Sequence, residues 1–261
     1  MITKEQLIND LSSLGVPMGS IVTVHTSLRA VGEIEGGGET LLDALIEIFT
    51  REGGLLAIPT HTWDSDVYDL RKSESCIGTL PRLAAGRSDS YRTLHPTHSM
   101  AVFGDRERAL DFIKDEESAD TPANPEGCLG KLCREDGYVL LLGVGQDKNT
   151  FLHCVEEMMK VPHRLTSHKV KKYNVHPDGR REERELFWFD ESSIPDVSVY
   201  FTKFEPAFRY HGAIRDGRVG NAPVQLCHAP KMKEVLEIIY NRNNFGELLD
   251  SLSPLDEKLY K

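Results

Sequence analysis

Residues 138–160, YVLLLGVGQDKNTFLHCVEEMMK, join a short apolar run to an amphipathic one through a turn with two glycines. The run at 138–142 predicts a buried strand, and the spacing at 150–160 predicts a helix. Side chains three positions apart share a helix face, so we expect His153 and Glu156 to lie together, with Asp147 on the preceding loop. An imidazole beside carboxylates at a strand's carboxyl end is typical of a general base. The spacing fits equally a histidine in a structural ion pair.

The rest of the chain alternates apolar runs with amphipathic ones. We expect further strands near 21–25, 55–59 and 99–104, and helices at 3–14, 39–50, 106–115, 229–241 and 245–258. Loops are expected at 64–77 and 119–130, and antiparallel strands at 168–175 and 183–190, joined by a turn at 176–179. This order predicts an α/β protein, a three-layer α/β/α arrangement with a mixed central sheet and a smaller antiparallel β region in the C-terminal half. We expect a single domain, 1–261.

Composition narrows the class of partner. The chain has 261 residues and a formal charge of −10, from 31 Lys plus Arg against 41 Asp plus Glu. This balance argues against nucleic-acid binding, which needs cationic surface, and is compatible with a cationic small molecule. No apolar run is long enough to span a membrane, and residues 1–7 lack the apolar core of a signal peptide, so we expect a cytoplasmic protein.

Cysteines and histidines are the residues most often found in disulfides and metal sites. The five cysteines are odd in number and form no CxxC pair, which indicates reduced thiols rather than a disulfide framework. Several histidines lie near the ends of the expected strands, namely His25, His61, His95, His98 and His153. These histidines leave a metal-dependent hydrolase as an alternative function, although no HExxH motif occurs. We expect no metal.

Four apolar strands adjoin polar turns, at 25–27, 60–63, 95–99 and 145–147. In open α/β sheets ligands bind at the carboxyl ends of the strands, and at least three of these turns can converge there. Ser27, with the backbone amides of Leu28 and Arg29, can bind an oxyanion if it opens a helical turn. Plain helix capping is the alternative. The glycines at 36–38 match neither a dinucleotide nor a P-loop motif.

At these turns the chain resembles the aminoglycoside 3-N-acetyltransferase family. Five ordered blocks over about residues 1–230 carry the resemblance: His25-Thr26-Ser27-Leu28 with Gly32, Pro59-Thr60-His61-Thr62, His95-Pro96-Thr97-His98-Ser99, Asp147-x-x-Thr150-x-Leu152-His153-x-x-Glu156, and Gly217-Arg218-Val219-Gly220-Asn221-Ala222. Thr26 stands where the family's block has its first Ser. Five spaced blocks in the family's order are more specific than any one of them.

The resemblance implies acetyl transfer from acetyl-coenzyme A to the 3-amine of a 2-deoxystreptamine aminoglycoside. His153 would be the base, and Asp147 and Glu156 would orient it or hold the substrate. Ser27, Leu28, His95 and Ser99 would lie on the coenzyme side, with Thr26 as a candidate donor to the thioester oxygen. An amine attacks a thioester only as the free base, so a neutral imidazole suits this reaction. We expect direct transfer, without an acyl-enzyme.

For the cationic acceptor we nominate four carboxylates beside expected strand ends, Asp64, Asp66, Asp190 and Glu191. Each is also compatible with a solvated loop charge. Three alternatives stay open: an acetyltransferase for another amine, the metal-dependent hydrolase, and a non-catalytic small-molecule binding protein. A homodimer is expected only from its general frequency.

Overall fold

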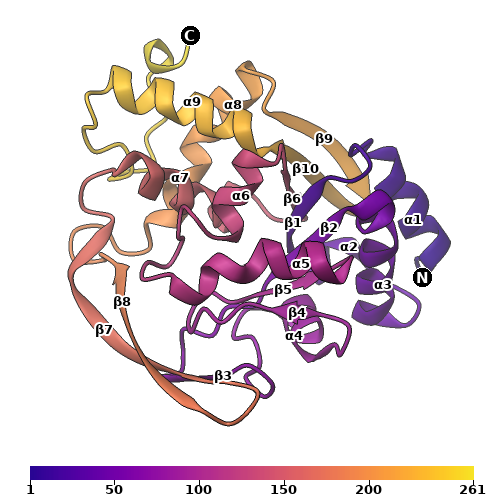
Figure 1. The fold of residues 1–261 in the computed structure, drawn as a ribbon. Coiled ribbons are helices and arrows are strands. Elements are labelled where there is room, and N and C mark those ends of the chain that lie inside the picture. The colour runs from indigo at the N-terminus through magenta and orange to yellow at the C-terminus, as the bar shows by residue number, and fades with distance from the viewer.

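A computed structural model describes all 261 residues and is built on a seven-stranded mixed sheet (Figure 1). Its strands are β1 (Ile21–Thr26), β2 (Leu55–Pro59), β4 (Tyr91–Arg92), β5 (Met100–Phe103), β6 (Tyr138–Leu142), β9 (Ile214–Val219) and β10 (Ala222–His228). They are ordered β4-β5-β2-β1-β6-β10-β9. β1 pairs in parallel with β2 and β6, and the other neighbours are antiparallel. The predicted mixed central sheet is confirmed.

Helices cover both faces of this sheet. One face carries α1 (Lys4–Ser13), α2 (Leu28–Val31), α3 (Gly37–Phe49) and α4 (Thr79–Gly86), and the other carries α5 (Arg106–Ile113), α6 (Cys128–Arg134), α7 (Phe151–Met159), α8 (Glu205–Tyr210) and α9 (Ala229–Arg242). Val139 and Leu141 of β6 face one apolar core, and Leu140 and Leu142 face the other. Burial on both faces is why this strand reads as a continuous apolar run. The three-layer prediction is therefore confirmed.

A second, three-stranded sheet contains β3 (Val67–Asp69), β7 (Leu165–Val175) and β8 (Arg181–Phe189). β7 and β8 form the predicted antiparallel hairpin, which extends away from the main body (Figure 1). β3 pairs in parallel with β7, so the stretch 64–77 is not all loop. The pairing lies across more than ninety residues of sequence, and no local pattern indicates it.

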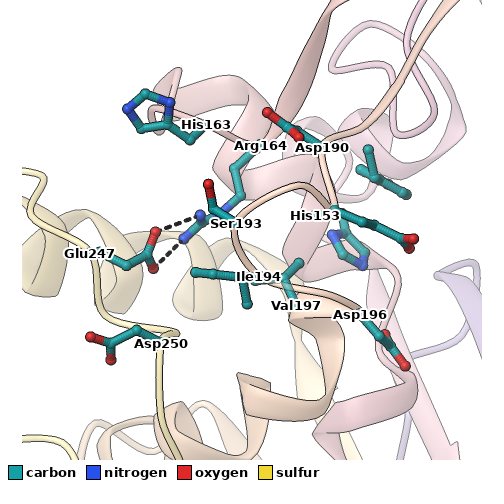
Figure 2. A pocket seen from close by; sticks show the side chains of 12 residues that line it. His153, His163, Arg164, Asp190, Ser193, Ile194, Asp196, Val197, Glu247 and Asp250 are labelled. Carbon is teal, nitrogen blue, oxygen red and sulfur yellow. Dashed lines mark hydrogen bonds and ion pairs between the residues drawn. The ribbon is translucent and has the colours of Figure 1, made fainter.

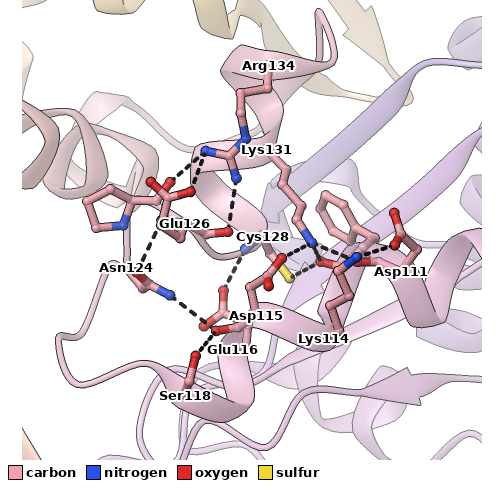
Figure 3. Close-up of polar contacts among 12 residues, drawn as sticks. Asp111, Lys114, Asp115, Glu116, Ser118, Asn124, Glu126, Cys128, Lys131 and Arg134 are labelled. Atoms are coloured by element: carbon pink, nitrogen blue, oxygen red, sulfur yellow. Dashed lines mark hydrogen bonds and ion pairs between the residues drawn. The ribbon is translucent and has the colours of Figure 1, made fainter.

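Two local predictions were wrong for physical reasons. The helix expected at 245–258 does not form: Phe245 has a left-handed φ of 54°, and the Glu247 side chain accepts from the backbone N–H groups of Leu248 and Leu249. Such side-chain bonds compete with helical ones. α6 begins at Cys128, inside the loop expected at 119–130. The Glu116 carboxylate accepts from the Cys128 amide at 2.6 Å and supplies a cap that Gly127 lacks (Figure 3).

Shorter elements complete the chain. Single-turn and 3₁₀ segments lie at Arg51–Gly53, Lys114–Ser118, Gln146–Lys148, Val197–Phe204 and Glu257–Leu259. None of the helices combines the length and apolar character that crossing a bilayer requires. The expectation of a single domain stays a prediction.

The polar turns meet at one edge of the large sheet. β1, β2 and β6 are parallel, so their carboxyl ends share that edge. β5 runs the other way and begins there, because Met100 pairs with Pro59 at the end of β2. The convergence expected of three turns is confirmed, and the turn at 95–99 joins them.

Candidate active site

A cavity of about 660 Å³ opens at this edge of the sheet. The end of β1 contributes His25 and Thr26, and the segment after β2 contributes His61 and Trp63. The remaining wall includes the start of α4, His98, the 144–153 segment, the end of β8 and residues beyond β8. Most of these positions follow a strand, which is where ligands bind in α/β sheets.

His153 lies on the first turn of α7 and lines this cavity. Its ring stacks on Phe189 with centroids 4.3 Å apart and meets the edge of Phe201 at 4.7 Å. Its pKa is lowered to about 3, first by burial and then by the positive charge of Arg164, while the charge of Asp196 acts in the opposite direction. The imidazole is therefore neutral at physiological pH and makes no hydrogen bond to another protein group.

Glu156 forms no hydrogen bond or ion pair with His153, so the predicted pairing of the two side chains is not found. Its carboxylate is 1% exposed, and Oε1 accepts from Arg164 Nε at 2.9 Å and from the Tyr240 hydroxyl. Burial raises the pKa of Glu156, and the charge of Arg164 opposes that shift. The structural ion pair left open by the spacing exists, but Arg164 rather than the histidine is the partner.

Two other carboxylates share the cavity with His153. Asp147 lies on the short turn before α7, as predicted, and its nearest charged partner is Lys148 at 3.1 Å. Asp196 was not predicted. Its backbone is left-handed, with φ 45°, and the Ser198 hydroxyl donates to its Oδ1 at 2.5 Å. Asp196 lies 43 residues beyond His153 in the sequence. The one sequence signal for its place in the site is that it follows the second strand of the predicted hairpin.

The predicted coenzyme residues at the end of β1 differ in whether they line the cavity. Thr26 lines the cavity, and its buried Oγ1 has no hydrogen-bond partner, as is also true of His25 Nε2. Ser27 caps α2 by accepting from the Ala30 amide at 3.4 Å, and Leu28 is the first residue of that helix. Ser27 and Leu28 do not line the cavity. Ser27 therefore follows the capping interpretation, and Thr26 keeps a free hydroxyl for a ligand.

His95 and Ser99 are buried in and beside the turn before β5, and their predicted place on the coenzyme side stays a prediction. His95 Nε2 bonds the Thr121 carbonyl at 2.9 Å, while Nδ1 accepts from the amides of Thr97 and His98. The Ser99 hydroxyl donates to the Thr60 carbonyl at 3.0 Å. Neither residue lines the cavity, because the turn uses their polar atoms to satisfy its own backbone.

A second cavity, of about 410 Å³, shares His153, Phe189, Glu191 and Asp196 with the first (Figure 2). Five carboxylates line it: Asp190, Glu191, Asp196, Glu247 and Asp250. The first two were predicted, and Glu191 lines both cavities. Asp64 lines neither, and Asp66 is 81% exposed and paired with Lys172 at 2.9 Å. Glu247 and Asp250 were missed because they lie almost one hundred residues from the motif that contains His153.

The histidines around the first cavity form an aromatic wall. His61 stacks on Trp63 at 4.8 Å, and His98 lies 4.6 Å from His61. Burial lowers the pKa of both imidazoles well below its ordinary value. No group of three His, Cys, Asp or Glu side chains has an arrangement that holds a metal ion. The hydrolase alternative thus lacks a ligand set, and the five cysteines are free thiols.

Sequence comparison identifies the family to which this chain is similar. The profile of the family described as aminoglycoside 3-N-acetyltransferase matches residues 23–239. Aminoglycoside N(3)-acetyltransferase IV from Salmonella sp is 34% identical, over 87% of this chain and 91% of the relative. Aminoglycoside N(3)-acetyltransferase VIII from Streptomyces fradiae is 29% identical, over 87% and 88%.

Solved structures agree. A histidine-to-alanine mutant of the acetyltransferase AAC(3)-IVa, in complex with a gentamicin, superposes with a TM-score of 0.76 at 26% identity, covering 93% of this chain and 90% of that one. YokD from Bacillus subtilis gives 0.80 at 22% identity, covering 95% and 96%. AAC-IIIb in a binary complex with CoASH gives 0.76 at 23% identity, covering 94% and 98%. The last two support the fold alone.

Proposed function

Because this chain belongs to the aminoglycoside 3-N-acetyltransferase family, we propose that it transfers the acetyl group of acetyl-coenzyme A to the 3-amine of a 2-deoxystreptamine aminoglycoside. The observation that carries this proposal is the position of His153. Its neutral imidazole lines two cavities at once. Aromatic rings and three carboxylates line the first cavity, and five carboxylates, two of them shared with the first, line the second. A polycationic acceptor suits the acidic cavity, and the donor suits the aromatic one.

In this reaction the acceptor nitrogen attacks the thioester carbonyl carbon. The N–C bond forms, the C–S bond breaks, and coenzyme A leaves as the thiolate. The proton released by the nitrogen passes to His153. The imidazole of His153 is neutral, so it has a free lone pair to accept that proton.

Charge also develops on the thioester oxygen. Thr26 Oγ1, buried and without a protein partner, is the candidate donor to that oxyanion. Asp147 and Asp196 share the cavity with His153 and are placed to stabilise the imidazolium once it forms. No residue of the chain needs to become acetylated in this direct transfer.

The relatives support both substrates. A solved relative holds CoASH, and another holds a gentamicin, an aminoglycoside. Both statements concern those proteins, and they come to this chain through its family membership and the shared fold. Acetyl-coenzyme A as co-substrate is therefore part of the proposal.

A second candidate is transfer to a different cationic amine. Two of the four carboxylates nominated for an aminoglycoside, Asp64 and Asp66, lie outside both cavities. YokD, with its TM-score of 0.80, is described as aminoglycoside acetyltransferase-like rather than by a named substrate. The donor and the base would be the same for either acceptor.

The deciding experiment follows thiol release from acetyl-coenzyme A with gentamicin, other deoxystreptamine drugs and simple polyamines as acceptors. Turnover with a drug, and a product shown by NMR to carry acetyl on the 3-amine, is the expected result. Turnover only with simple amines would favour the second candidate. Binding of acetyl-coenzyme A without turnover on any amine would contradict the proposed reaction.

A further inference from the structure

Four histidines line the first cavity, and they differ in how their ring nitrogens are satisfied. His98 Nδ1 lies 2.9 Å from the Thr97 hydroxyl and bonds with it. His25 Nε2 and His61 Nδ1 are buried and have no hydrogen-bond partner, and the ring of His153 has none either. Buried polar groups of folded proteins are normally hydrogen-bonded. The free nitrogens that gather in this one cavity therefore point to a ligand that satisfies them.

The register of the large sheet decides which face His25 occupies. Its Cα pairs with Leu141 of β6, and paired residues of neighbouring strands point to the same face. Leu141 packs in the apolar core that also contains Phe151 of α7. Ile21, four residues before His25 on β1, belongs to the same core, as the alternation of side chains along a strand requires. His25 therefore lies on the face that α7 covers, which is the face of the base His153.

Thr26, the next residue of β1, lies on the opposite face. Its Cα pairs with Leu142, which packs with Val24 in the other apolar core. Both Thr26 and His25 line the cavity, so the end of β1 presents one polar side chain to it from each face of the sheet. A thioester that reacts beside His153 has His25 on its own side of the sheet.

The surroundings of His25 suit a hydrogen-bond donor rather than an acid. Its side chain is 8% exposed, and burial lowers its pKa to about 4. The ring is therefore neutral at physiological pH and carries one N–H. A neutral imidazole of this kind polarises a carbonyl by donating to its oxygen, and it keeps its own proton throughout the reaction.

We propose that His25 is a catalytic residue that donates a hydrogen bond from its imidazole N–H to the thioester oxygen, on the same face of the sheet as His153. This inference rests on the proposed function and adds a second donor to Thr26. As the acceptor nitrogen attacks, the C=O π electrons move to the oxygen, and the bond from His25 strengthens. When the C=O bond forms again, the C–S bond breaks and the thiolate leaves. No proton or electron is exchanged with His25.

The first test is infrared spectroscopy of acetyl-coenzyme A labelled with ¹³C at the carbonyl and bound to the protein without an acceptor. A hydrogen bond to the oxygen weakens the C=O bond and lowers its stretching frequency. We expect a lower frequency on wild type than on His25→Phe, which keeps an aromatic ring but has no N–H. His25→Gln keeps a donor and should restore part of the shift. Since no amine is present, the result does not depend on which acceptor the protein uses.

The second test separates kcat from KM. A donor that acts mainly on the developing oxyanion lowers the barrier, so we expect kcat of His25→Phe to fall about 10²-fold with KM for acetyl-coenzyme A nearly unchanged. His25→Gln should lose less. His228→Phe is the matched control, because His228 also ends a strand, β10, and lines neither cavity. Its kcat should equal that of wild type.

His25→Leu is the second variant without an N–H, for the case that phenylalanine does not fit the buried site. A folded variant, Phe or Leu, whose bound thioester absorbs at the wild-type frequency would overturn the inference, even if its kcat falls. That outcome leaves acetyl transfer by wild type intact. If wild type itself does not bind acetyl-coenzyme A, the proposed reaction is wrong and the role of His25 is wrong with it.

Discussion

Two histidines of this chain occupy motifs that look equally functional in sequence, and the structure gives them opposite surroundings. His95, in the turn before β5, is fully buried, and both of its ring nitrogens are bonded to backbone groups. His153, on α7, packs between Phe189 and Phe201, lines two cavities and has no protein hydrogen bond. A ring whose nitrogens are satisfied is a support, and a ring whose nitrogens are free can react.

The largest difference between the two regions should appear in catalysis. Replacing His153 with glutamine removes the proton acceptor, and we expect thiol release from acetyl-coenzyme A to fall by about 10²–10⁴-fold. The variant should still bind acetyl-coenzyme A and unfold close to wild type, because glutamine fills much of the same space. The measurement pairs steady-state kinetics with thermal unfolding. Wild-type turnover in a folded variant would remove His153 from the reaction.

Replacing His95 should reduce the stability of the fold rather than the catalytic rate. His95→Ala takes a partner from the Thr121 carbonyl and from the amides of Thr97 and His98, all in a buried turn. We expect the free energy of unfolding to fall by about 3 kcal/mol, since each buried unpaired group costs about 1–3 kcal/mol. Urea unfolding measures this loss, and turnover per folded molecule should change far less than in His153→Gln. A stable His95 variant without activity would make His95 a ligand contact after all.

The same contrast explains how much of the molecule could be predicted. The strands β1, β2, β5 and β6 and the long helices α1, α3, α5, α7 and α9 follow from local periodicity, because each buries its own apolar side chains. The strands β4, β9 and β10 and the helix α8 were not predicted. β3 and the start of α6 do not follow from periodicity, because each depends on a partner far away, β7 for one and Glu116 for the other. The helix expected at 245–258 is replaced by side-chain bonds of Glu247 that no periodicity reveals.

The site residues also fall into those that a local sequence pattern predicts and those that depend on distant segments. Thr26, Asp147, His153 and Glu191 could be predicted, since each lies beside the end of an element that is itself readable. Glu156 shares a helix with His153, and helix spacing could not show that Arg164 binds it instead. Asp196, Glu247 and Asp250 belong to irregular segments, which reach the site only because the hairpin and the C-terminal segment fold back on α7.

The buried His95 should also make the free energy of unfolding depend on pH. Burial lowers the pKa of His95 to about 4, from 6.5, so the folded protein excludes a proton that the unfolded chain takes up. Its contribution is constant above pH 6.5 and becomes unfavourable as pH falls toward 4, by about 1.4 kcal/mol per pH unit. In the reverse sense, Glu116 and Glu157, with pKa values raised to about 7, favour the folded state as pH falls from 7 toward 4.5.

The comparison of wild type with His95→Gln isolates the histidine from those carboxylates. Urea unfolding at pH 7.5, 6.5, 5.5 and 4.5 should give a smaller acid loss for the variant, by about 1.4 kcal/mol per pH unit below 6.5. Parallel curves for the two proteins would mean that His95 takes up its proton at the same pH in the folded and the unfolded state. The folded ring would then be protonated below pH 6.5, and Nδ1 could no longer accept from the Thr97 and His98 amides.

The smallest effect tests whether the acidic wall, rather than acidity in general, selects the acceptor. Glu191→Gln removes an exposed carboxylate that lines both cavities, and we expect KM for a cationic acceptor to rise about 2–5-fold, as for a charge pair worth 0.5–1 kcal/mol. KM for acetyl-coenzyme A should not rise, because Glu191 also lines the cavity proposed for this anionic donor and its removal takes away a negative charge. Asp66→Asn changes the net charge equally, yet Asp66 is paired with Lys172 outside both cavities and should leave both constants unchanged. Added salt should shrink the Glu191 effect, since exposed charges are screened. Equal effects of the two substitutions would mean that the acceptor responds to the net charge of the protein, and that the second cavity has no special part in binding it.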